Sequence, residues 1–191
     1  SDFDEVEWIE QKELLGLGHA IALTRPVVEG CPMLVVYGDT IFRADLSSLL
    51  VGDRAGVLGV KRVDDPRRFG VVVQQGGRVV RLVEKPDSFV SDQAIVGVNY
   101  IRDSALLYRC LADLMDRQLR TRGEYQLTDA LQMMVDRGAD LATFGVDDWF
   151  DCGTQEALLV TNRYLLDGRK VPEAPNTSVI IPPEIGRAHV L

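Results

Sequence analysis

The sequence predicts an α/β fold in which a Rossmann-like, mixed and mostly parallel sheet is flanked by helices. Short apolar runs of strand length recur along the chain. They alternate with segments whose apolar residues recur at helical spacing. A glycine-containing hairpin at 70–83 adds an antiparallel part. The 191 residues suffice for one domain with a short appendage.

The predicted strands are apolar runs bounded by glycine or polar residues. They cover 33–37, 55–61, 94–101, 141–146 and 149–151, with a shorter candidate at 6–9. The hairpin joins 70–73 to 78–83 through Gly76-Gly77, because paired glycines between β-branched runs suit a tight turn.

The predicted helices are amphipathic segments, most of which begin at a capping residue. Asp45 caps a short helix to Leu50, Ser104 caps one to Met115, and Thr154 opens one to Leu166. Two more helices are predicted at 19–28 and 126–135.

The composition limits the classes of function that the chain can have. The formal net charge of −8 argues against broad nucleic-acid binding, so a site for a phosphorylated ligand needs local cations or a metal. Three cysteines without a Cys-x-x-Cys pair predict a reduced, cytoplasmic protein. No apolar run reaches transmembrane length, and the acidic start does not resemble a signal peptide, so a soluble protein is expected with no membrane partner.

Two acids lie at the ends of apolar runs. Asp39 follows Gly38 after the run at 33–37, and Asp151 precedes Cys152 and Gly153. Ligands of α/β sheets bind at the carboxyl edge of the strands, where two carboxylates can hold Mg²⁺. Each acid also has a structural interpretation: Asp39 can cap the next turn, and Asp151 can cap the helix that begins near residue 154.

The composition changes near the C-terminus. The sequence predicts one α/β domain over 1–168, a proline-rich linker at 169–176 and a different unit at 177–191. In this last segment Val179, Ile185 and Leu191 recur every six residues, as in the start of a left-handed hexapeptide β-helix.

Six motifs then resemble, in order and approximate spacing, the sugar-1-phosphate nucleotidylyltransferases. The similarity covers about 6–168 and is strongest to the glucose-1-phosphate thymidylyl- and uridylyltransferase branch. The motifs are Gln11-Lys12-Glu13-Leu14-Leu15-Gly16-Leu17-Gly18-His19-Ala20, Val36-Tyr37-Gly38-Asp39, Arg68-Phe69-Gly70-Val71, Val83-Glu84-Lys85-Pro86, Gly123-Glu124-Tyr125-Gln126-Leu127-Thr128-Asp129 and Trp149-Phe150-Asp151-Cys152-Gly153-Thr154.

The resemblance implies an enzyme that joins a nucleoside triphosphate to a sugar 1-phosphate and releases pyrophosphate. It implies that Asp39 and Asp151 hold Mg²⁺ and act in catalysis with Lys85. The implied substrate contacts are Gln11 and Gly16 for the base, Gly70, Glu84 and the backbone near Ile95 for the sugar, and Lys85 for its phosphate. Adjacent strand residues point to opposite faces, so Glu84 and Lys85 can share a pocket only if the strand twists or ends there.

One family feature is missing from the sequence. Members of the family open with a strand and a Gly-x-Gly-Thr-Arg loop that cradles the triphosphate, and the segment at 52–56 matches it only superficially. The chain is therefore interpreted as lacking an N-terminal segment and is expected to have little or no transferase activity alone. The sheet edge exposed in this way would favour a homo-oligomer.

Two other functions stay open. A regulatory paralogue that binds a nucleotide sugar without turning it over fits the missing loop equally well. A glycosyltransferase would present Asp-x-Asp after a strand, but the only such match is Asp2-Phe3-Asp4 at the N-terminus.

Overall fold

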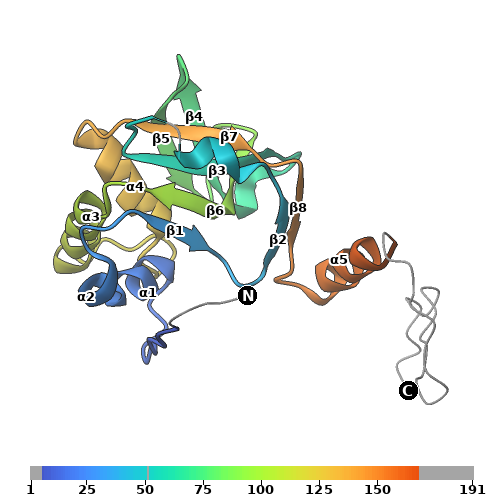
Figure 1. The fold of residues 1–191 in the computed structure, drawn as a ribbon, viewed down its shortest axis with the longest axis horizontal. Helices are drawn as coiled ribbons and strands as arrows, with labels where there is room; N and C mark the ends of the chain where they lie inside the picture. Colours follow the sequence, from blue (N-terminus) through green and yellow to red (C-terminus); the bar gives the residue numbers. More distant parts are fainter. Residues whose placement is uncertain (1–5, 51, 168–191) are drawn as a thin grey trace.

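We describe residues 6–50 and 52–167 of a computed structural model of the chain (Figure 1). They form a six-stranded sheet, a separate two-stranded ribbon, five α-helices and two short 3₁₀ helices. The strands are β1 (Met33–Val36), β2 (Thr40–Arg43), β3 (Gly56–Arg62), β4 (Gly70–Gln75), β5 (Arg78–Glu84), β6 (Gln93–Ile101), β7 (Leu141–Gly145) and β8 (Asp148–Asp151). The α-helices are α1 (Leu17–Leu23), α2 (Arg25–Val28), α3 (Ser104–Asp116), α4 (Leu127–Asp136) and α5 (Gln155–Asp167), and the 3₁₀ helices are η1 (Leu46–Leu50) and η2 (Pro66–Arg68).

The sheet is mixed, and the prediction that it is mostly parallel was wrong. Its order is β5-β4-β6-β3-β7, with β1 paired to β6 as well. Strands β1, β3 and β4 all pair antiparallel with β6, and only β3 and β7 pair in parallel. Strands β1, β3, β4 and β7 thus share one direction, and β5 and β6 run the opposite way. Strand β6 lies between β4 and β3 in the sheet. Apolar runs in the sequence show that strands exist, whereas the place of β6 between β4 and β3 depends on pairing between distant segments.

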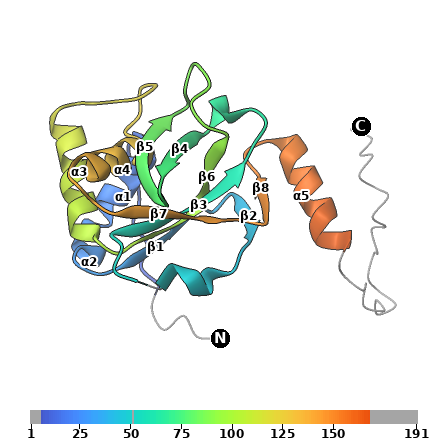
Figure 2. The same ribbon diagram turned by 90° about the horizontal axis from the view of Figure 1, so that it is seen from above.

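Both faces of the sheet are covered. Leu58 on β3 packs with Leu107 and Leu111 of α3 and with Leu131 of α4 in the largest apolar cluster. The neighbouring Val57 belongs to a second cluster with Leu49 of η1. This alternation follows from the two-residue period of a strand. Figures 1 and 2 show α1 to α4 grouped on one side of the molecule, with the β2–β8 ribbon and α5 at the other end.

Most predicted elements are confirmed, with shifts of one or two residues at their ends. The hairpin forms between β4 and β5, and Gly76 and Gly77 both adopt positive φ in its turn. The predicted strand at 6–9 is absent, since 6–10 has no regular structure. The predicted helix at 19–28 is two helices, because Thr24 ends α1 and Pro26 lies in the first turn of α2.

Helix α3 begins at its predicted cap, Ser104, so the true N-cap lies one residue earlier. The N-cap is Asp103, whose carboxylate accepts a hydrogen bond from the Leu106 N–H at 2.9 Å. Ser104 is instead the first helical residue, and its hydroxyl accepts a hydrogen bond from the Gly30 N–H at 3.0 Å.

We expect Asp103→Ala to lower the free energy of unfolding by about 1 kcal/mol, because it removes this N-cap. Denaturant titration measures the change. The matched control is Asp116→Ala at the other end of α3, where an acidic side chain opposes the helix dipole and its loss should not destabilise. Equal destabilisation by both variants would contradict the assigned cap.

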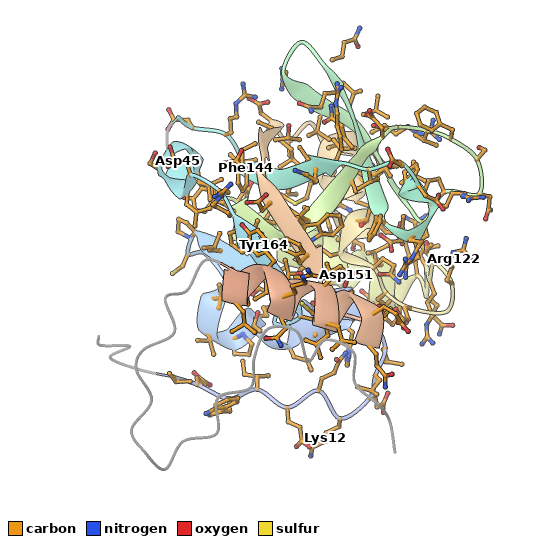
Figure 3. The ribbon with its side chains drawn as sticks, turned by 90° about the vertical axis from the view of Figure 1, so that its right-hand side faces the viewer. Lys12, Asp45, Arg122, Phe144, Asp151 and Tyr164 are labelled. Carbon is orange, nitrogen blue, oxygen red and sulfur yellow. The ribbon has the colours of Figure 1, made fainter. Side chains whose placement is uncertain are left out.

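Helix α5 is joined to the rest of the chain through the ribbon. Strands β2 and β8 pair antiparallel, with Thr40 opposite Asp151. The Tyr164 hydroxyl donates a hydrogen bond to Asp148 at 2.7 Å, and its ring lies 4.4 Å from that of Phe150. Figure 3 looks onto α5 and shows Tyr164 on it, with Asp151 on the adjoining strand. Strand β2 was not predicted from the sequence.

The linker at 169–176, the β-helix start at 177–191 and the motif at 2–4 lie outside the described residues. Among the residues described, no helix has the length and apolarity that a membrane span requires.

Candidate functional site

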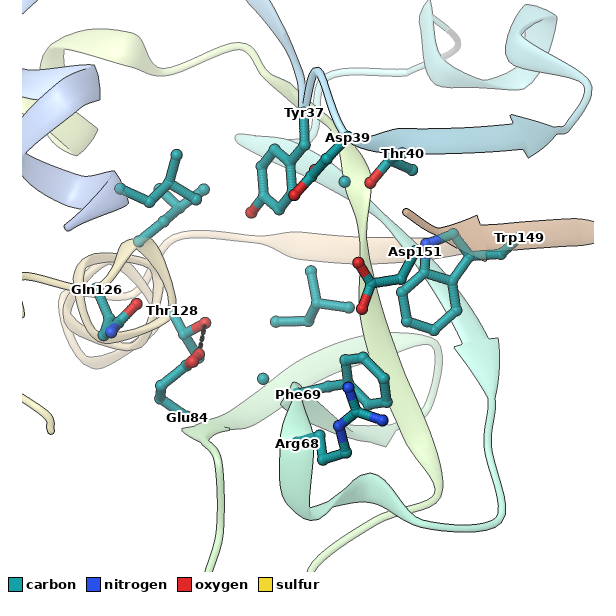
Figure 4. A pocket seen from close by; sticks show the side chains of 15 residues that line it. Tyr37, Asp39, Thr40, Arg68, Phe69, Glu84, Gln126, Thr128, Trp149 and Asp151 are labelled. Atoms are coloured by element: carbon teal, nitrogen blue, oxygen red, sulfur yellow. Dashed lines mark hydrogen bonds between the residues drawn. The ribbon is translucent and has the colours of Figure 1, made fainter. Parts of the chain in front are cut away.

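A pocket of about 200 Å³ lies where the ribbon meets the sheet and the N-terminal end of α4 (Figure 4). It collects five of the predicted site residues from distant parts of the chain: Asp39, Gly70, Glu84, Ile95 and Asp151. Predicted residues outside its lining are Gln11, Gly16 and Lys85.

The two predicted metal ligands share this pocket. Asp39 directly precedes β2 and Asp151 ends β8, so the pairing of these strands brings them together. The Cys152 N–H donates to the Asp39 backbone oxygen at 2.8 Å, which ties the two segments at this point. Figure 4 shows both carboxylates directed into the pocket.

The carboxylates of Asp39 and Asp151 are available to a cation. Within 6–50 and 52–167, the Asp39 carboxylate has no hydrogen-bond or ion-pair partner, and Asp151 accepts only the Gly153 N–H, at 3.1 Å. Oxygen donors in this number suit Mg²⁺, which usually takes one or two carboxylates and completes its shell with phosphate and water. The described residues contain no cluster of three or more His, Cys, Asp or Glu that could hold a metal.

Glu84 lies on the opposite wall, and its side chain is only 9% exposed. It accepts a hydrogen bond from the Thr128 hydroxyl at 2.7 Å, drawn in Figure 4. Burial raises the pKa of Glu84, although the Thr128 hydroxyl and the Lys85 cation act in the opposite direction. This carboxylate is therefore held in one position at a cost to folding.

Gly70 provides the space for this pair. A Cβ at position 70 would lie 2.6 Å from the Thr128 hydroxyl oxygen and 2.9 Å from Glu84 Oε2. Both distances are shorter than real Cβ contacts, so the Glu84–Thr128 hydrogen bond needs a glycine here. Gly70 pairs with Glu84 across the hairpin, which explains why two motifs separated in sequence meet.

Lys85 lies beside Glu84 because the strand ends there. Strand β5 stops at Glu84, and Lys85 has a positive φ of 42°. Its Nζ lies 3.7 Å from Glu84 Oε1. Neighbouring residues within a strand face opposite ways, but β5 ends at Glu84, so Lys85 can turn toward it. The sequence predicted such a strand end from Pro86. Lys85 stands next to the pocket without lining it.

Gln11 and Gly16 form a separate unit before α1. The Gln11 side-chain amide donates to the Gly16 carbonyl at 3.0 Å and lies 2.9 Å from His19 Nδ1. Gly16 has a φ of +99°, and a Cβ there would lie 2.8 Å from the Tyr125 backbone oxygen. The structure brings these two residues together but does not bring them to the pocket.

Several pocket residues were missed by the sequence analysis, namely Tyr37, Thr40, Arg68, Phe69, Gln126, Thr128 and Trp149. Phe69 and Trp149 pack edge to face with ring centroids 4.9 Å apart, which joins the hairpin to the ribbon. Burial, together with the nearby Glu84 and Asp39, raises the pKa of Tyr37, so its hydroxyl stays protonated. All but one of them lie within the quoted motifs, and Thr40 directly follows one; these positions were the signal that could have found them.

We expect Glu84→Gln to raise the unfolding temperature at neutral pH. Because the folded pKa is raised, the folded chain holds this proton more tightly than the unfolded chain does. The free energy of unfolding therefore falls as pH rises from the pKa of Glu84 in the unfolded chain through its pKa in the folded chain. Glutamine removes that loss, and its side-chain oxygen can still accept the hydrogen bond from Thr128. Thermal unfolding at acidic and neutral pH measures it, with the exposed Glu156→Gln as the control. A variant that is less stable at neutral pH would contradict the assignment.

The mixed sheet, the ribbon and the acid-lined pocket define an α/β domain with a candidate binding site at the junction of sheet and ribbon. The nucleotidyl transferase family model matches residues 1–168, and the chain belongs to this family.

Individual relatives are distant. The chain is 30% identical over 173 residues to the bifunctional protein GlmU of Methanococcus vannielii, covering 85% of this chain and 39% of that protein. It is 30% identical over 170 residues to a glucose-1-phosphate thymidylyltransferase of Streptomyces antibioticus, covering 85% of this chain and 46% of that protein. The chain thus spans less than half the length of these two relatives.

Solved structures agree on the fold. A UDP-glucose pyrophosphorylase complexed with UDP-glucose superposes with a TM-score of 0.73 at 21% identity, covering 85% of this chain and 66% of that one. The prediction of a nucleotidylyltransferase-like fold is confirmed.

Proposed function

We propose that this chain serves in forming a nucleotide sugar of the dTDP- or UDP-glucose type, with release of pyrophosphate, from a nucleoside triphosphate and a sugar 1-phosphate. The main support is one pocket that combines Asp39 and Asp151 with Gly70, Glu84 and Ile95. The names of relatives, a glucose-1-phosphate thymidylyltransferase and a structure with UDP-glucose, agree with this choice.

The wall formed by Glu84 and Gly70 is suited to a sugar. Thr128 holds one carboxylate oxygen of Glu84, so the carboxylate is fixed and can accept hydrogen bonds from sugar hydroxyls. Gly70 lets the sugar approach the backbone without a side chain between them. Ile95 lines the same pocket and offers apolar contact together with its backbone.

Asp39 and Asp151 would hold Mg²⁺ on the other wall, and the bound ion would neutralise phosphate charge. The reaction is an in-line attack of the sugar phosphate oxygen on the α-phosphorus: that P–O bond forms while the bond to pyrophosphate breaks. It needs positioning and charge neutralisation, and no protein nucleophile. Lys85, next to Glu84, would bind the phosphate of the sugar.

Gln11 and Gly16 would bind the base. Both N–H donors of the Gln11 amide are used, one by the Gly16 carbonyl and one by His19 Nδ1. The amide therefore offers its oxygen, which accepts from the ring N–H of uracil or thymine and has no donor to meet on the corresponding nitrogen of cytosine. This favours UDP or dTDP sugars.

A cytoplasmic location is part of the same proposal. All three cysteines are unpaired, which fits a reducing compartment. The outer edge of β1 pairs with no strand among the described residues and carries the half-exposed Leu34 and Val36, which would support a homo-oligomer.

Calorimetric titration with UDP-glucose, dTDP-glucose and CDP-glucose, each with and without Mg²⁺, tests the proposal. We expect binding of the first two, strengthened by Mg²⁺, and weaker binding of the third. Absence of binding to all three would overturn it. A turnover assay of this chain beside an N-terminally extended version then separates an enzyme from the alternative, a regulatory protein that binds nucleotide sugars, since the latter would release no pyrophosphate in either form.

A further inference from the structure

The charge balance of the pocket is unusual for a site that takes a phosphorylated ligand. Its lining contains three carboxylates, Asp39, Glu84 and Asp151, and a single cationic side chain, Arg68. Mg²⁺ on Asp39 and Asp151 would offset only part of the repulsion that these acids exert on phosphate. The ligand therefore needs a further positive group on the wall.

The guanidinium of Arg68 can supply this further positive charge. Among the described residues, two other cations near the pocket have acidic partners. Lys85, proposed above for the same phosphate, stands outside the lining and shares its charge with Glu84 at 3.7 Å, and Arg122 donates to Asp87 at 3.0 Å. No hydrogen bond or ion pair to Arg68 is found within 6–50 and 52–167, and its guanidinium lies 5.9 Å from the centre of the Phe69 ring.

The local fold separates Arg68 from its neighbour Arg67. The 3₁₀ helix η2 is capped by Asp65, and Arg67 turns back to bind that carboxylate through two nitrogens, at 2.7 and 2.9 Å. Arg68 is directed to the pocket instead, where Figure 4 shows it beside Phe69 on the wall that faces Asp151. The edge-to-face contact of Phe69 with Trp149 fixes this wall.

We propose that Arg68 binds the phosphate attached to the sugar, a role that the sequence motifs did not assign to it. A guanidinium can meet two phosphate oxygens at once, so it would orient this phosphate as well as attract it. The inference rests on the proposed function, because it needs a sugar phosphate in this pocket.

The test compares Arg68→Gln with Arg67→Gln by calorimetric titration of UDP-glucose and UDP-glucuronate in the presence of Mg²⁺. We expect Arg68→Gln to weaken binding of both ligands about tenfold, the scale of a lost hydrogen bond to a charged group. Arg68→Lys should restore part of the affinity, because it keeps the charge. Arg67→Gln should bind like the unmodified chain.

A second readout distinguishes a phosphate contact from a structural role. The dependence of the dissociation constant on salt should become shallower in Arg68→Gln and stay unchanged in Arg67→Gln, while both variants keep the unfolding temperature. Unchanged affinity in Arg68→Gln, or an equal loss in Arg67→Gln, would overturn the inference. A loss confined to UDP-glucuronate would overturn it too, since Arg68 would then bind a sugar carboxylate. Failure of the unmodified chain to bind any sugar nucleotide would instead refute the proposed function.

Discussion

Asp39→Asn and Asp151→Asn are each expected to abolish the strengthening of nucleotide-sugar binding by Mg²⁺. Asparagine keeps the size of the side chain and one oxygen but removes the negative charge that attracts the cation. At Asp151 the substituted side chain can still accept the Gly153 N–H, so the local turn should persist. In the presence of Mg²⁺ we expect each variant to bind about a hundredfold more weakly, because loss of even an outer-shell partner of a metal ligand costs about 10–100-fold in metal affinity.

Titration with and without Mg²⁺ measures this effect, and the double variant sharpens it. If both acids hold one ion, the two losses are not independent, so Asp39→Asn with Asp151→Asn should bind about as weakly as either single variant. Asp147→Asn is the control, because Asp147 is exposed directly before β8 and lies outside the pocket. Binding that ignores both single substitutions would remove the metal assignment.

The fold could be predicted from the sequence wherever the signal is local. The turn at Gly76 and Gly77 and the apolar rows of α3 and α4 depend on neighbouring residues, and these elements were predicted nearly at their observed bounds. The direction of β6 and the pairing of β2 with β8 depend on contacts between segments far apart in the chain. Neither hydrophobic periodicity nor turn residues carry that information, so the sheet was predicted with too much parallel pairing.

The site shows the same division. Asp39, Glu84 and Asp151 could be selected because each ends or adjoins an apolar run within a motif. Arg68 and Thr128 lie within the same motifs but were not selected, because only the fold shows that Thr128 binds Glu84 and that Arg68 lines the pocket. Arg67 and Arg68 are identical residues side by side, and only the fold shows that one binds Asp65 and the other lines the pocket. The opposing effects on the Glu84 pKa likewise appear only once burial is known.

Gly70→Ala is expected to weaken sugar-nucleotide binding on the order of tenfold to a hundredfold while the chain still folds. The added methyl group would lie 2.6 Å from the Thr128 hydroxyl and 2.9 Å from Glu84 Oε2, so both side chains must move and their hydrogen bond must break. Overpacking of this kind costs about 1–3 kcal/mol of stability. Glu84 can turn away, so the larger effect falls on the fixed carboxylate and hence on binding.

Titration with UDP-glucose and thermal unfolding measure the two effects separately. Gly145→Ala is the matched control, since a Cβ at this strand end meets nothing within 4 Å and should leave both quantities unchanged. In a Thr128→Ala background the nearest obstacle is gone, so Gly70→Ala should cost less stability than it does in the unmodified chain. An equal cost in both backgrounds would show that the glycine serves the strand alone. A smaller cost would show that this glycine exists to let Thr128 fix Glu84.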